Sequence, residues 1–309
     1  MRPVVLPLPG NGRLAAALVD KLNAELGQQD VRRFPDGDTY VRIDTPIAKR
    51  SVVLVCTLDR PDDKFLPLLF TAATARDLGA THVGLVCPYL AYMRQDRRFR
   101  PGEGITSSYF AKMLSGSVDW LVTIDPHLHR RSSLSEIYSV PSLVLHAAPL
   151  ISRWIKQNVH DSIVIGPDRE SEQWVASVAQ GAGVPHLVLD KNRHGDRDVE
   201  VSTSTVDGCT SHTPVLVDDI ISTGHTMIET VRQLRHAGLA PPICVGVHGI
   251  FAGDAYRELH AAGAERVVTC NTISHESNAI DLTDILCDAA RRIGDDHTGF
   301  VPAAAMCAP

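Results

Sequence analysis

Short apolar runs alternate with longer amphipathic stretches along almost the whole chain. The short runs are rich in Val, Ile and Leu with little polar alternation, which is typical of strands buried on both faces. The longer stretches have helical spacing, and Gly238 and Gly263 follow two of them where a helix commonly ends. Strands are expected at residues 3–8, 51–58, 82–89, 119–125, 162–168, 186–190, 213–219, 242–251 and 266–271, and helices at 64–79, 104–115, 170–181, 225–237 and 253–262. This order predicts a parallel sheet with helices on both faces.

The strand and helix pattern runs through the chain twice. The first series ends near residues 140–150, and a new helix is expected at 150–158. We therefore predict an α/β protein with two similar domains, residues 1–145 and 146–309, each a mostly parallel sheet flanked by helices. We leave open the alternative that the final helix and the Ala/Pro-rich tail pack back on the first domain.

Composition and charge narrow the function classes. Hydrophobic residues make up 44% and charged residues 21% of the 309 residues, which is normal for a globular protein. No apolar run approaches the roughly 18 residues of a membrane span. The opening MRPVVLPLPG resembles a strand more than a signal peptide, so we expect a cytoplasmic protein without a membrane partner. The net charge of −6 offers no broad basic field for nucleic acid. The seven cysteines include no C-x-x-C pair, which favours reduced core thiols.

Polar and charged side chains follow several of the predicted strands. An arginine-rich stretch, RQDRRFR, comes after the strand that ends at Tyr89. Asp125 ends a second strand and His127 comes just after it, Asp168 ends a third strand, and Asp218 with Asp219 ends a fourth. Ligands of open parallel sheets bind beyond the carboxyl ends of the strands. The sequence therefore predicts two ligand crevices, one in each half of the chain.

The stretch VLVDDIISTGHTM, residues 215–227, carries the clearest chemistry. A loop of small residues, 222–226, opens a helix, so its backbone N–H groups and hydroxyls would form a cradle for phosphate. Asp218 and Asp219 cannot hold phosphate, but they can accept hydrogen bonds from sugar hydroxyls or hold a cation. A phosphate and vicinal hydroxyls together indicate a phosphorylated sugar as ligand.

This stretch resembles the binding motif for phosphoribosyl diphosphate (PRPP), which type I phosphoribosyltransferases share with PRPP synthetases, the ribose-phosphate pyrophosphokinases. The motif alone does not separate the two groups. Other segments resemble the synthetases, in order over nearly the whole chain: RRFPDGDTYVRI (32–43), the segment 88–114 with its Arg-Gln-Asp-Arg block, DPHLHR, IGPDRES, the Lys-x-Arg loop in 189–201, and NTISHE (271–276). The chain is thus similar to the PRPP synthetase family, nearer its archaeal-type branch.

The resemblance implies transfer of the β,γ-diphosphoryl group of ATP to the C1 hydroxyl of ribose 5-phosphate, with Mg²⁺, giving PRPP and AMP. The first domain would bind ATP and the second ribose 5-phosphate. A homo-oligomer, dimer or larger, is implied because Phe34, Asp36 and Asp38 would reach ATP from a neighbouring subunit. The other implied roles are ATP binding for Arg94, Gln95 and Arg97; sugar-phosphate binding for Asp218, Asp219, Ser222, Thr223, Gly224, His225 and Thr226; Mg²⁺ binding for His127 and Asp168; and catalysis for Lys191 and Arg193.

The chain departs from the family pattern at two of its expected site residues, and two other functions are considered. Ser222 stands where the synthetase motif usually has Asp, and Asp38 stands where it has Glu. A phosphoribosyltransferase that consumes PRPP is one alternative, and a non-catalytic synthetase-like regulatory subunit is the other. The second is less favoured because the expected catalytic and metal residues are all present.

Overall fold

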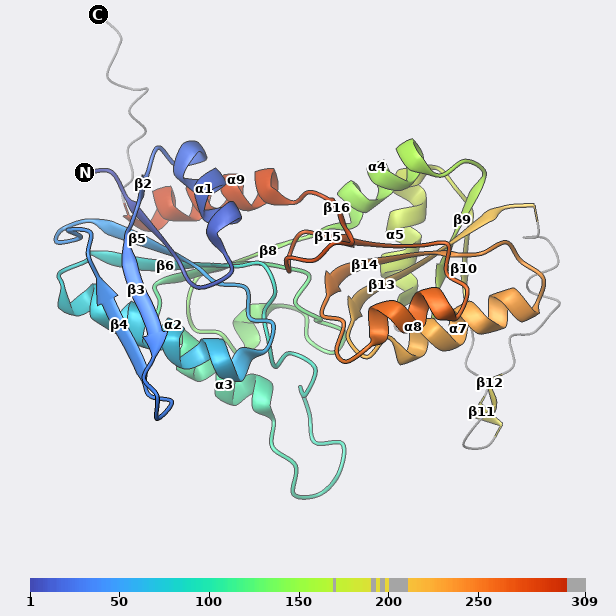
Figure 1. The fold of residues 1–309 in the computed structure, drawn as a ribbon, viewed down its shortest axis with the longest axis horizontal. Coiled ribbons are helices and arrows are strands. Elements are labelled where there is room, and N and C mark those ends of the chain that lie inside the picture. The colour runs from blue at the N-terminus through green and yellow to red at the C-terminus, as the bar shows by residue number, and fades with distance from the viewer. Residues whose placement is uncertain (169–170, 190–192, 195–197, 200–210, 299–309) are drawn as a thin grey trace, which may run out of the picture. The chain divides into compact units, whose positions relative to one another are not determined.

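The protein divides into two compact units. The computed structural model describes residues 1–168, 171–189, 193–194, 198–199 and 211–298. The first unit contains Met1–Leu145 and the segment that starts at Thr283, and the second contains His146–Leu282. Each unit is built on a six-stranded sheet in which all neighbouring strands run parallel (Figure 1).

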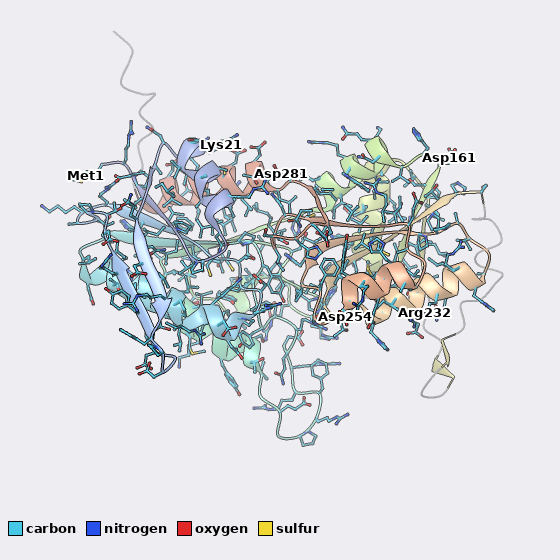
Figure 2. The ribbon with its side chains drawn as sticks, viewed as in Figure 1. Met1, Lys21, Asp161, Arg232, Asp254 and Asp281 are labelled. Atoms are coloured by element: carbon cyan, nitrogen blue, oxygen red, sulfur yellow. The ribbon has the colours of Figure 1, made fainter. Side chains whose placement is uncertain are left out.

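The sheet of the first unit has the strand order β2-β1-β5-β6-β7-β8. Helices α1 and α9 lie on one face and α2 and α3 on the other (Figure 1). Lys21 of α1, labelled in Figure 2, pairs with Asp284 of α9 at 3.0 Å. An antiparallel hairpin, β3 (Gln29–Arg33) with β4 (Thr39–Ile43), stands beside the sheet. The other elements are β1 (Val4–Pro7), α1 (Gly12–Lys21), β2 (Glu25–Leu26), β5 (Ser51–Val55), α2 (Pro61–Asp77), β6 (His82–Cys87), α3 (Thr106–Ser115), β7 (Trp120–Ile124), a 3-10 turn (Leu134–Glu136), β8 (Ser142–Leu145) and α9 (Thr283–Thr298).

The sheet of the second unit has the order β10-β9-β13-β14-β15-β16. Helices α4 and α5 cover one face, and α7 and α8 cover the other (Figure 1). The elements are α4 (Ala148–Asn158), β9 (Ser162–Gly166), α5 (Glu172–Ala182), β10 (His186–Val188), β13 (Thr213–Ile221), α7 (His225–His236), β14 (Ile243–Gly249), α8 (Ala255–Ala261), β15 (Arg266–Cys270) and β16 (Asn278–Ile280). Strands β11 (Arg193–His194) and β12 (Asp198–Val199) form a separate antiparallel pair.

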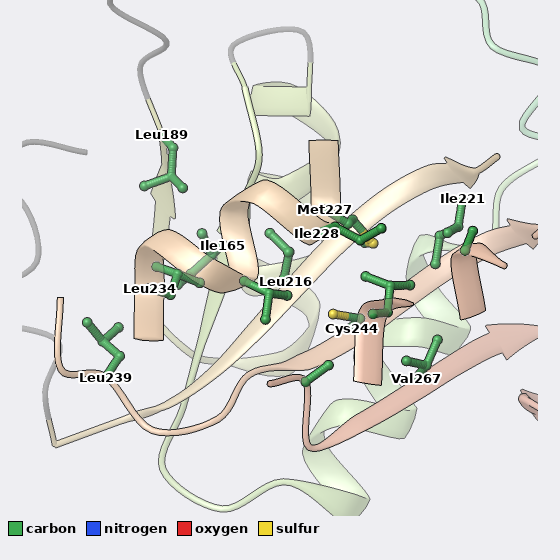
Figure 3. Packing of buried hydrophobic residues seen from close by; sticks show 14 of the residues in the cluster. Ile165, Leu189, Leu216, Ile221, Met227, Ile228, Leu234, Leu239, Cys244 and Val267 are labelled. Atoms are coloured by element: carbon green, nitrogen blue, oxygen red, sulfur yellow. The ribbon is translucent and has the colours of Figure 1, made fainter. Parts of the chain in front are cut away.

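The core between this second sheet and α7 explains where the helix lies. Met227, Ile228, Val231 and Leu234 of α7 recur at helical spacing and are buried against Leu216 and other strand residues (Figure 3). The prediction that Gly238 and Gly263 follow the ends of two helices is confirmed. Gly238 has φ +82° after α7 and Gly263 has φ +108° after α8, a conformation that glycine adopts at little cost.

The predicted α/β class with two parallel sheets is confirmed, but several strand boundaries differ, and one of them concerns site residues. The strand expected at 213–219 continues to Ile221, because β14 supplies pairing partners for Ile220 and Ile221. Asp218 and Asp219 therefore lie inside β13 and not at its end. Among the residues that the structure describes, no helix is long and apolar enough to cross a membrane.

Candidate functional site

Residues 222–226, which join β13 to α7 and include the first two residues of the helix, have the geometry of an anion cradle; we call them the 222–226 loop. Gly224 caps the helix with φ +68°, in the left-handed region. The N–H groups of Ile250 and Phe251 donate to the carbonyl of Ile221, and Ala252 donates to that of Ser222. Since a trans peptide sets its C=O and N–H in opposite directions, these bonds turn the following N–H groups away from the 250–252 segment.

The N–H groups of this loop are available to a ligand. Within the described part of the chain, the backbone N–H groups of Thr223, Gly224, His225 and Thr226 have no hydrogen-bond acceptor. The side chains of Ser222 and Thr226 are half-buried, and those of Thr223 and His225 are exposed. Converging donors at the N-terminus of a twelve-residue helix favour a bound anion such as phosphate.

Three carboxylates lie together beside this loop. Asp218 and Asp219 are consecutive residues of β13, so their side chains start on opposite faces of the strand. Asp168 follows the neighbouring strand β9. Burial, then the negative charges of Asp219 and Asp168, raise the pKa of Asp218 well above its usual range. Although the residue as a whole is half-buried, its carboxyl is the desolvated part, and Asp218 interacts with both Asp219 and Asp168 in one acidic cluster.

This acidic cluster fits a hard divalent cation. Carboxylate oxygens are the ligands that Mg²⁺ prefers in proteins, and a cation would relieve the repulsion that raises the pKa of Asp218. The carboxyl of Asp218 also accepts the N–H of Asp219 at 3.0 Å, which holds it in place. Of the two predicted metal ligands, Asp168 belongs to this cluster, while His127 belongs to the first unit.

The arginine-rich loop of the first unit follows β6. The side chains of Arg94 and Arg97 are exposed, and the guanidinium of Arg97 lies 4.9 Å from the centroid of the Phe99 ring. Gln95 is half-buried, and its Oε1 accepts the hydroxyl of Thr106 at 3.0 Å at the start of α3. Exposed guanidinium groups beside a fixed amide suit the oxygens and base of a nucleotide.

His127 lies in a strained turn after β7. Asp125 has φ +33° and His127 has φ +54°, values that side chains other than glycine seldom adopt. The N–H of His127 donates to the carbonyl of Asp125 at 2.9 Å, and its ring meets that of His129 edge to face at 4.2 Å. Strain of this kind persists only where surrounding contacts hold it, and it is common at functional sites.

The hairpin β3–β4 presents Phe34, Asp36 and Asp38 at its exposed tip. Phe34 is 41% exposed, and the N–H of Phe34 donates to the carbonyl of Asp38 at 2.8 Å across the turn. Its ring meets Tyr40 edge to face at 5.7 Å, and the guanidinium of Arg32 lies within 5.1 Å of both ring centroids. An exposed, supported aromatic ring is suited to stacking on a base.

The predicted catalytic pair is only partly described. Arg193 lies in β11 and pairs with Val199 of β12, which places its backbone in a short hairpin. Lys191 lies outside the described residues, as does the side chain of Arg193. The structure thus groups Asp168, Asp218, Asp219 and the 222–226 loop in the second unit. It places the nucleotide candidates and His127 in the first.

Two supporting features were missed by sequence reasoning. The 250–252 segment fixes the 222–226 loop through three backbone hydrogen bonds, which leave no mark in the side-chain sequence. Asn11 is buried after β1, where its amide donates to the carbonyls of Leu8 and Pro9 and accepts the N–H of Thr57 after β5. A lone Asn in the glycine-rich LPGNGR was the only signal for this second contact.

Comparisons with known proteins agree with this arrangement. Residues 4–117 match the family model described as the N-terminal domain of ribose phosphate pyrophosphokinase, and residues 133–284 match the phosphoribosyl transferase domain. The ribose-phosphate pyrophosphokinase of Methanopyrus kandleri is 32% identical over 293 residues, covering 94% of this chain and 99% of that protein. The enzyme so named from Methanothermobacter thermautotrophicus is 30% identical over 289 residues, covering 93% and 100%.

A solved structure shares the fold. Phosphoribosylpyrophosphate synthetase from Mycobacterium smegmatis matches with a TM-score of 0.82 and 22% identity, over 96% of this chain and 100% of that chain. The two family models and the archaeal relatives indicate one family, and the shared fold is consistent with it. This chain belongs to the ribose-phosphate pyrophosphokinase family.

Proposed function

We propose that this protein is a ribose-phosphate diphosphokinase, which converts ATP and ribose 5-phosphate to PRPP and AMP. The observation that carries the proposal is the acidic cluster of Asp168, Asp218 and Asp219 beside the N–H groups of residues 223–226. The loop suits the 5-phosphate, and the carboxylates suit ribose hydroxyls or a cation. The relatives' names and the family's N-terminal domain in residues 4–117 support a nucleotide as the second substrate.

The reaction is a diphosphoryl transfer in line. The C1 oxygen of ribose 5-phosphate attacks the β-phosphorus of ATP, the bond from that phosphorus to the α,β-bridging oxygen breaks, and AMP leaves. The proton of the C1 hydroxyl passes to solvent or a nearby base. Arg94, Gln95 and Arg97 bind the nucleotide, and Phe34, Asp36 and Asp38 of a neighbouring subunit hold its adenine. Lys191 and Arg193 neutralise charge on the transferring group.

The 222–226 loop and Asp219 hold the sugar, while Asp168, Asp218 and His127 would hold Mg²⁺. The metal, when bound, would neutralise phosphate oxygens and draw charge from the β-phosphorus. Asp168 and Asp218 would supply oxygen ligands, and His127 would act through a bound water. A homo-oligomer and a cytoplasmic location form part of the same proposal.

One assay separates this function from its alternatives. Incubation of the protein with ATP, Mg²⁺ and ribose 5-phosphate should give AMP and PRPP in equal amounts. A phosphoribosyltransferase would instead need PRPP and a base, release diphosphate and ignore ATP. A regulatory subunit would bind nucleotide and form neither product, and either outcome would overturn the proposal.

Gly224→Ala should weaken ribose 5-phosphate binding. A Cβ at Gly224 meets Ile228 and Ala255 at 3.4 Å, and the φ of +68° costs other residues about 1–2 kcal/mol. Relaxation of that strain would turn the loop's N–H groups away from the phosphate. We expect the KM for ribose 5-phosphate to rise about ten-fold, the change that about 1.4 kcal/mol gives, while the KM for ATP stays unchanged.

Gly238→Ala is the matched control. Gly238 has a similar φ of +82°, follows the same helix at its other end and has open space around its Cα. It should lose stability to a comparable extent and keep both KM values. If the two variants have the same kinetics, the 222–226 loop is not the phosphate site.

A further inference from the structure

Asp96 is the one acid within the arginine-rich loop RQDRRFR, and its surroundings differ from those of its neighbours. Its side chain is only 4% exposed, whereas Arg94, Arg97 and Arg98 are exposed. Both of its carboxylate oxygens lie 3.4 Å from Nη1 of Arg130. Its backbone carbonyl accepts Nη2 of Arg131 at 3.2 Å. Two arginines from another loop therefore converge on this single residue.

Those two arginines lie three and four residues after His127, which belongs to the strained turn. The left-handed backbone at Asp125 and His127 needs contacts to hold it. Arg131 also lies 3.6 Å from Glu136, whose carboxylate accepts the N–H and hydroxyl of Ser132. The guanidinium of Arg130 also lies 5.6 Å from the centroid of the Phe99 ring, in the loop after β6. The turn after β7 is thus fastened to the loop after β6 through Asp96.

Fold stability alone explains this contact poorly. A buried carboxylate loses its hydration, and a pair at 3.4 Å recovers only part of that cost. The contact is of more use to a catalytic site than to the stability of the fold, because small displacements of binding groups reduce reaction rates strongly.

We propose that Asp96 is a positioning residue that locks the loop of Arg94 and Gln95 to the turn of His127, so that the groups for nucleotide and metal keep one relative geometry. This inference rests on the proposed function. It adds a role for a residue that touches neither substrate, since its side chain is turned into the protein and occupied by Arg130.

Asp96→Asn tests the role. The variant keeps the size of the side chain and removes the charge that fixes Arg130. We expect the KM for ATP to rise at least ten-fold and the Mg²⁺ concentration for half-maximal rate to rise with it, while the KM for ribose 5-phosphate stays within two-fold of wild type. Arg130→Gln should reproduce this pattern. The double variant should be no worse than either single variant, because both remove the same link.

Asp119→Asn is the control for a merely structural ion pair. Asp119 pairs with Arg76 at 2.9 Å and accepts the N–H of Val83. It lies just before β7, at the amino-terminal ends of the strands, whereas Asp96 follows the carboxyl end of β6. The Asp119→Asn variant should have a lower melting temperature and an unchanged KM for ATP. If Asp96→Asn behaves like Asp119→Asn, with lowered stability and unchanged KM for ATP, the positioning role is wrong. If the wild-type protein makes no PRPP, the proposed function fails instead.

Discussion

Asp218→Asn should give a protein that is more stable than wild type at neutral pH yet forms PRPP at least about 100-fold more slowly. The raised pKa of Asp218 means that the fold holds its charged form at a cost, through burial and the nearby charges of Asp219 and Asp168. An amide of the same shape avoids that cost. We expect a gain of about 0.5–2 kcal/mol in the free energy of unfolding, as is common when a functional site loses a destabilising charge. The rate falls because the amide cannot neutralise a cation.

The pH dependence gives this prediction its sign. The pKa of Asp218 in the folded protein lies above its unfolded value near 3.8. The contribution of this raised pKa to the free energy of unfolding is therefore complete below pH 3.8, and it is lost as the pH rises through the folded pKa. Wild type and variant should therefore be equally stable at the acidic end, and the variant should lead increasingly toward pH 7. Denaturant unfolding without Mg²⁺ or nucleotide, from pH 4 to 8, measures this difference.

Asp161→Asn serves as the control. Asp161, labelled in Figure 2, is exposed just before β9, and its backbone carbonyl, which the substitution retains, accepts the N–H of Thr213. This variant should match wild type in stability and rate at every pH. An Asp218→Asn protein that is less stable than wild type at pH 7 would show that the carboxylate makes a stabilising contact and is not held at a cost.

The fold could be predicted largely because its strands are buried on both faces. Continuous runs such as 51–58 and 82–89 identify β5 and β6 without any tertiary information. The hairpin β3–β4 was missed because its polar strands, including QDVRR, carry no such run and are held by pairing with each other. The end of β13 was missed because Ile220 and Ile221 stay in the strand only through partners on β14, far along the chain.

One part of the candidate site could be predicted from the sequence and another part could not. Residues 215–227 are contiguous, so their spacing alone predicted a loop at a helix N-terminus, which the structure contains. The role of Asp96 depends on Arg130 and Arg131, more than thirty residues away. An acid among arginines also looks like solvated surface in a sequence. Contacts between loops are set by the order of strands in the sheet, where β6 and β7 are neighbours, and no local pattern encodes them.

Lys191→Ala should reduce kcat for PRPP formation by about 10²–10³-fold with little change in stability. Negative charge grows on the transferring diphosphoryl group, and the loss of one positioned group that stabilises such charge commonly costs this much. Lys191 lies between the end of β10 at Val188 and the start of β11 at Arg193, outside the described residues. Binding of ribose 5-phosphate depends on a different part of the second unit, so its affinity should be unchanged. Single-turnover measurement of AMP formation isolates the chemical step.

Lys156→Ala is the matched control, because Lys156 is an exposed lysine on α4 in the same unit. It removes one positive charge from the same unit and should retain wild-type turnover. Lys191→Arg keeps a positive charge and should recover part of the lost rate. The recovery should be incomplete, because the planar guanidinium of arginine does not place its charge where the compact ammonium group of lysine does. Near-normal PRPP formation by Lys191→Ala would mean that transition-state charge is neutralised by Arg193 and the metal alone, and the lysine would lose its catalytic role.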